Sequence, residues 1–123
     1  MITGKVNKAL DPIVSLTIIG NGTEVTVDAV IDTGFSGELT LPLDLIKSLT
    51  LLWRSRGISI LGDGSESVFD LYFGAVIWNN KIHKVVIDSV ETMPLIGMRL
   101  LRNSTLWIEV CEGGDVRIES MLP

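Results

Sequence analysis

Short apolar runs separated by turn-forming residues are the feature that most constrains the fold of this chain. Each run is four to eight residues long, and each pair of runs flanks a segment rich in glycine, asparagine or aspartate. The pairs are residues 13–19 with 24–31, 58–61 with 67–73, 75–78 with 82–87, and 106–110 with 116–119. Runs of this length are typical of β-strands, and the residues between them suit hairpin turns. The sequence therefore predicts an all-β domain.

Two segments depart from this pattern and predict short helices. Residues 42–49 open with a proline, which suits the first turn of a helix, and they place Leu45, Ile46 and Leu49 on one side. Residues 97–103 set three apolar side chains among polar ones and predict a second short helix.

The length and composition fit a single domain spanning residues 1–123. Hydrophobic residues make up 46% of the chain and the mean hydropathy is +0.43, which is high for a protein of this size. Two interpretations of this surplus stay open. One is a well-filled β core, and the other is an apolar face hidden in a subunit interface.

Charge and cysteine content exclude several classes of function. The net charge is −5 and no strong basic cluster is present, so we expect no binding to nucleic acid. The single cysteine, Cys111, cannot form an internal disulfide, and its apolar surroundings predict a buried, inert side chain. One histidine and one cysteine cannot supply a tetrahedral metal site, so we expect no metal or other cofactor. No apolar run approaches the ~18 residues of a membrane span, and we expect a soluble, cytoplasmic protein.

The most informative local motif is an Asp-Thr-Gly triplet that follows an apolar run. Residues 29–31 lead into Asp32, Thr33 and Gly34, and residues 35–41 continue through a second turn into another apolar run. A carboxylate placed behind a hydrophobic strand costs energy unless it is neutralised or used. A simple alternative is an aspartate that bonds its own turn. The apolar approach and exit favour a catalytic carboxylate at Asp32.

The motif Asp-Thr-Gly-Phe-Ser-Gly resembles the active-site segment of the aspartic proteases. By length the chain is similar to their single-domain, retropepsin-like branch, including its small bacterial and archaeal members. The resemblance implies a closed β-barrel of the acid-protease type. It also implies that Asp32 is catalytic, that Thr33 bonds to the matching loop of a partner, and that Gly34 permits close backbone approach and unusual backbone angles.

The same resemblance implies a homodimer. Asp-Thr-Gly occurs once in the chain, whereas the chemistry needs two aspartates. We therefore expect two subunits that each contribute Asp32 to hydrolyse a peptide or protein substrate. In the resembled family the terminal strands interleave between subunits, which implies that the apolar residues 2–6 and 116–122 build the dimer.

A second marker of the family is the segment Leu95-Ile96-Gly97, where the resemblance implies that Ile96 and Gly97 pack against the Asp32 loop. Residues 18–20 also read apolar-apolar-Gly, but they precede Asp32 and lie at a predicted hairpin turn. The following Arg99 departs from the Gly-Met-Asp-Leu-Leu of microbial relatives, a change that touches a surface or interface contact rather than the acid chemistry.

The hairpin over residues 58–73 occupies the position of the flap that closes over substrate in the resembled family. Its tip would supply the mobile, substrate-binding residues Gly62, Asp63, Gly64 and Ser65. The alternative is an ordinary surface hairpin, and the sequence does not separate the two.

Two other interpretations of the whole chain stay open. The first is a non-catalytic, retropepsin-like dimer that binds peptides, since a fold does not guarantee an activity. The second is an unrelated small β-barrel with a chance triplet.

Overall fold

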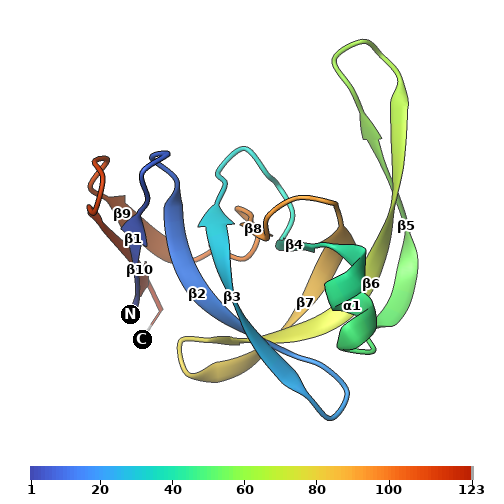
Figure 1. Ribbon diagram of the computed structural model, residues 1–123, viewed down its shortest axis with the longest axis horizontal. Coiled ribbons are helices and arrows are strands. Elements are labelled where there is room, and N and C mark those ends of the chain that lie inside the picture. The colour runs from blue at the N-terminus through green and yellow to red at the C-terminus, as the bar shows by residue number, and fades with distance from the viewer. Residues whose placement is uncertain (123) are drawn as a thin grey trace.

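The computed structural model describes residues 1–122, and β-strands dominate it. The all-β prediction is confirmed. Figure 1 shows the order of the elements along the chain. They are β1 (Ile2–Val6), β2 (Pro12–Ile19), β3 (Glu24–Ile31), β4 (Leu39–Leu41), α1 (Leu43–Ser48), β5 (Leu52–Ile60), β6 (Glu66–Trp78), β7 (Lys81–Ser89), β8 (Leu95–Ile96), β9 (Ser104–Ile108) and β10 (Asp115–Ser120).

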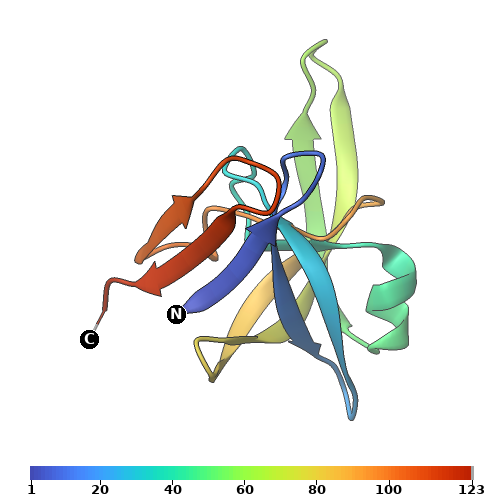
Figure 2. The ribbon, with the colours of Figure 1, turned by 60° about the vertical axis from the view of Figure 1, so that its left-hand side comes forward.

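All of these strands belong to one sheet, in the order β5-β6-β7-β4-β8-β3-β2-β1-β10-β9. Most neighbours are antiparallel, but β3 with β8 and β4 with β7 are parallel. The sheet bends strongly (Figure 2). As a result β6 also pairs with β2, and Ile18 lies opposite Val76. This bend encloses the apolar core.

The predicted hairpins are present, with two differences in strand length. β5 begins at Leu52, six residues before the expected start, and β6 continues through Gly74 where two separate runs were expected. Gly74 does not interrupt β6 because the Ile87 side chain of the neighbouring strand fills the space that a Cβ would take. At the β6–β7 turn, Asn79 and Asn80 have φ values of 51° and 63°, the left-handed angles that two-residue hairpin turns require.

The core is made of aliphatic side chains from most of the sheet and from α1. Leu39 and Leu41 of β4, Ile46 of α1 and Ile96 of β8 are all fully buried. The short strands β4 and β8 therefore lie in the middle of the core. The six residues of α1 lie within the first predicted helix, and Ile46 is the buried side chain of α1.

The second predicted helix is wrong, because residues 97–103 form hydrogen-bonded turns instead. The N–H groups of Leu100 and Leu101 both bond to the carbonyl of Gly97, and Asn103 then adopts a φ of 63°. A segment this short gains too little from helical hydrogen bonds to extend the first turn. It is held by burial of Leu100 and Leu101 in the core.

The prediction for Cys111 is also wrong, because its side chain is exposed. β9 ends at Ile108, and Cys111 lies in the turn that leads to β10. Its N–H bonds to the carbonyl of Glu109 two residues earlier, so the backbone has already left the strand. The prediction failed because the apolar pattern in the sequence continues beyond the end of β9.

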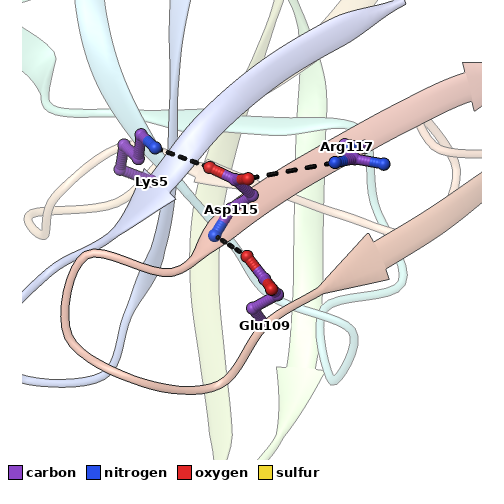
Figure 3. A network of polar contacts seen from close by, with 4 residues as sticks. All are labelled: Lys5, Glu109, Asp115 and Arg117. Atoms are coloured by element: carbon purple, nitrogen blue, oxygen red, sulfur yellow. Dashed lines mark hydrogen bonds and ion pairs between the residues drawn. The ribbon is translucent and has the colours of Figure 1, made fainter.

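The two ends of the chain meet in β1, β10 and β9. β10 pairs with both other strands, and its Val116 and Ile118 are fully buried. On the exposed side, the carboxylate of Asp115 pairs with Lys5 and Arg117, and Glu109 accepts a hydrogen bond from the Asp115 N–H (Figure 3). The bond from Lys5 holds the pKa of Asp115 below its usual range. The terminal strands are thus paired within one chain.

Within the described part of the chain, no helix combines the length and the apolar composition that crossing a bilayer requires.

Candidate active site

Strand β3 carries Asp32 to the start of a tight loop. The Asp32 N–H donates to the Ile96 carbonyl at 2.9 Å, which continues the pairing of β3 with β8 by one residue. Its side chain is half-buried, and Oδ1 accepts a hydrogen bond from the Gly34 N–H at 2.9 Å. The N–H of Phe35 bonds to the Asp32 carbonyl at 3.1 Å and closes the turn. The carboxylate is therefore held by its own loop.

The loop reverses the chain around β8, which lies between β3 and β4. β8 is parallel to β3 and antiparallel to β4, so the Asp32 loop joins two strands that run on either side of it. Residues just after β8 hold the loop through backbone hydrogen bonds. The N–H groups of Gly97, Met98 and Arg99 bond to carbonyls of residues 38, 35 and 37, at 2.9, 2.9 and 3.1 Å.

Gly97 is required by close packing against this loop. A Cβ at Gly97 would collide with the carbonyl oxygen of Gly37 and would lie 2.6 Å from a ring carbon of Phe35. No side chain fits there without moving the loop backbone. The structure therefore brings Ile96 and Gly97 together with Asp32, as the sequence analysis expected.

The other two residues of the triplet lie at the surface. Thr33 is exposed and makes no side-chain hydrogen bond within the described residues. The expectation of unusual backbone angles at Gly34 is wrong, because its φ lies outside the left-handed region. Glycine is favoured at position 34 by lack of space, since a Cβ there would approach Oδ1 of Asp32 to 3.2 Å.

A cleft of about 690 Å³ lies between the Asp32 loop and the β5–β6 hairpin. The loop side contributes Asp32, Phe35 and Thr40 to its walls. The hairpin side is mainly apolar and contributes Ile58, Leu61, Val68 and Phe69. The cleft therefore has an acid on one wall and mainly apolar side chains on the other.

The tip of the hairpin does not line this cleft. Its residues Gly62, Asp63, Gly64 and Ser65 form a turn closed by the bond from the Leu61 N–H to the Ser65 carbonyl. Hydrogen bonds from Ser65 lower the pKa of the exposed Asp63 carboxyl. The hairpin projects beyond the rest of the sheet (Figure 1). Its sides form the cleft wall, and the signal that sequence reasoning missed is the apolar pair Ile58 and Val68, which are direct partners across β5 and β6.

Asp88, near the end of β7, is a second acid in the cleft that sequence reasoning missed. It lies opposite Thr40 in the parallel pairing of β4 and β7. Burial, together with the nearby charge of Glu38, raises its pKa from 3.8 to about 6. Its sequence context is an ordinary strand end, so no local pattern marks it.

Asp32 and Asp88 of one chain lie on strands that are not neighbours. Three strand spacings separate β7 from β3, because β4 and β8 lie between them. At ~4.8 Å a spacing the path along the curved sheet is about 14 Å, and the direct separation is shorter, whereas carboxylates that share a proton lie in direct contact. The chain alone thus offers one acid at the loop and a second, separate one across the cleft.

No three histidine, cysteine, aspartate or glutamate side chains of residues 1–122 are grouped so that they could hold a metal ion. No family model, curated protein or solved structure matches this chain.

Proposed function

We propose that this protein is a retropepsin-like aspartic endopeptidase that acts as a homodimer. The observation that carries the proposal is the presentation of a single Asp-Thr-Gly at the cleft by a loop fastened to Ile96 and Gly97. The sequence resemblance names the same residues. The loop geometry gives a physical reason for each of them except Thr33.

The homodimer follows from the number of acids. Two carboxylates about 3 Å apart, each from one subunit, would repel by roughly 5 kcal/mol at an effective dielectric of 20 and would hold one proton between them. The ionised Asp32 accepts a proton from a bridging water, which attacks the scissile carbonyl. The protonated Asp32 of the partner subunit transfers its proton to that carbonyl oxygen, which gives a tetrahedral diol. As the C–N bond breaks, the leaving amine takes up the proton that Asp32 accepted from water, and a diol hydroxyl returns its proton to the partner's Asp32.

The pairing of the strands supports the proposed barrel. Starting from β2, the pairings run through β3, β8, β4, β7 and β6 and return to β2. Such a ring is what a closed sheet requires.

Exposed apolar side chains on the hairpin support a role in binding. Large exposed hydrophobic groups favour contact with a substrate or with a second subunit. On β5, β6 and the turn between them they are Leu52, Trp53, Ile58, Ile60, Leu61, Val68 and Phe73.

One observation favours the alternative of a non-catalytic, peptide-binding module. The hydrogen bond from the Gly34 N–H to Asp32 gives the carboxylate a structural use in its own turn. A scaffold could keep Asp32 for this reason and bind peptides in the same cleft.

The test is cleavage of a diverse peptide pool by the wild type and by Asp32→Asn, read by mass spectrometry. We expect Asp32→Asn to abolish cleavage, and we expect a pepstatin-like transition-state mimic to inhibit the wild type. Asp70→Asn is the matched control, because Asp70 is an acid of β6 outside the cleft. Undiminished cleavage by purified Asp32→Asn would end the protease proposal, whereas peptide binding without cleavage by either protein would favour the binding module.

A further inference from the structure

Asp88 is a cleft residue that the proposed chemistry does not use. Its side chain is half-buried and forms no hydrogen bond or ion pair with any described residue. Thr40 lies beside it on β4 and Leu71 on β6, and the ring of Phe69 lines the same cleft. An unpaired carboxylate among such neighbours is costly to ionise.

The charged groups around Asp88 do not neutralise it. Glu38, two residues before Thr40, directs one oxygen to the Val86 N–H at 2.9 Å, and its other oxygen lies 3.9 Å from His83. Arg54 and Arg99 line an adjoining hollow of about 310 Å³ together with Asp88, but neither forms an ion pair with it. Burial raises the pKa of Asp88 to about 6, and the like charge of Glu38 adds to this rise. A cation entering the cleft would relieve both costs.

We infer that Asp88 selects peptides that carry a lysine or arginine side chain close to the scissile bond. The inference rests on the proposed function and names the substrate class of that same cleft. About 14 Å along the curved sheet is an upper limit for the distance between Asp32 and Asp88, and it corresponds to roughly four residues of extended peptide. Because a lysine or arginine side chain itself spans part of this distance, the basic residue belongs two to four residues from the bond that is cut.

The test uses pairs of peptides that differ only in lysine or norleucine at one of these positions. The ratio of kcat/KM for the two peptides is measured for the wild type, Asp88→Asn and the control Asp70→Asn. At about pH 8 we expect the wild type and Asp70→Asn to prefer lysine about tenfold, the effect of one partly screened charge-assisted hydrogen bond. In Asp88→Asn we expect a ratio near one.

The pH dependence of this ratio separates Asp88 from Asp32. The preference of the wild type should fall towards one as the pH drops through about 6, because the Asp88 carboxyl becomes neutral. Protonation within the Asp32 pair changes both rates together and leaves the ratio unchanged. In Asp88→Asn the ratio should stay flat across the same range.

Failure of this inference differs from failure of the proposed function. Cleavage that needs Asp32 but shows equal ratios in wild type and Asp88→Asn would overturn the role of Asp88 and leave the protease proposal standing. If the wild type cleaves neither peptide, the protease proposal fails, and the role of Asp88 is then tested by the equilibrium binding of the two peptides. A lysine preference in binding that Asp88→Asn loses would support the role of Asp88, and equal binding would overturn it.

Discussion

Substitution of Gly97 by alanine tests how strongly the Asp32 loop depends on its close packing. The new Cβ would lie 2.8 Å from the carbonyl carbon of Gly37, closer still to its oxygen, and 2.6 Å from the ring of Phe35. Ordinary van der Waals contact begins at 3.4 Å, so the loop must move by more than 1 Å to clear the Gly37 carbonyl oxygen. The ring alone could rotate away, but the Gly37 carbonyl belongs to the backbone and accepts the hydrogen bond from Arg99.

The expected cost follows from these contacts. Overpacking of a core costs about 1–3 kcal/mol, and a clash with backbone belongs at the upper end of that range. Loss of one or two of the loop hydrogen bonds adds about 1 kcal/mol each. We therefore expect Gly97→Ala to lose roughly 4–5 kcal/mol of unfolding free energy, a large fraction of the total for a single domain.

Urea unfolding followed by circular dichroism measures this loss. Gly62→Ala is the matched control, because a Cβ at Gly62 has no neighbour within 4 Å, and we expect it to stay within about 0.5 kcal/mol of the wild type. Peptide cleavage by folded Gly97→Ala should also fall, since the loop that orients Asp32 has shifted. A Gly97→Ala protein that matches Gly62→Ala in stability and the wild type in cleavage would refute the reasoning.

Three further predictions concern acids and the core. Asp88→Asn should raise the unfolding free energy at about pH 8 by ~1–2 kcal/mol. The pKa rise of Asp88 from 3.8 to about 6 corresponds to at most ~3 kcal/mol, and this figure is reduced because solvent screens a half-exposed group. Because the raised pKa makes ionisation unfavourable in the folded state, this gain should disappear near pH 4, and equal gains at both pH values in urea unfolding would contradict it. In the proposed homodimer, Asp32→Asn should associate more tightly than the wild type at neutral pH, because an uncharged asparagine pair removes the repulsion between the two carboxylates. Association of the wild type should weaken as the pH rises, whereas that of Asp32→Asn should not; identical pH dependence of both proteins in sedimentation would show that the two carboxylates do not meet. Ile118→Ala should cost about 2–5 kcal/mol because Ile118 is fully buried within one chain, whereas Val110→Ala, at an exposed position, should change little, and similar urea midpoints for the two would be inconsistent with the packing of β10.

The parts of this structure that sequence predicts well are those specified locally. The hairpin turns follow from residues such as Asn79 and Asn80, whose left-handed angles suit a two-residue turn. The Asp-Thr-Gly turn follows from an apolar strand that ends in turn-forming residues. In each case the signal lies within about ten residues of the chain, so no knowledge of distant contacts is needed.

The parts that sequence misses depend on distant partners. Gly74 reads as a strand break until Ile87 is known to fill the space beside it. The pKa of Asp88 is raised first by burial that only the folded sheet provides, and second by Glu38, fifty residues earlier in the chain. Cys111 shows the reverse error, because an apolar pattern continued after the pairing of β9 had ended.

The insertion of β8 between β3 and β4 also determines when the acid loop can form. Val30 pairs with Leu95, so this contact closes a loop of 65 residues. The Asp32 N–H can form its hydrogen bond to the Ile96 carbonyl only after this loop has closed. Contacts between such distant segments form slowly, since the chain must first lose the entropy of closing the loop. During translation, Asp32 leaves the ribosome well before its supporting residues are made. A nascent chain therefore holds the acid without the cleft, and any hydrolytic activity is delayed until nearly the whole domain has been synthesised.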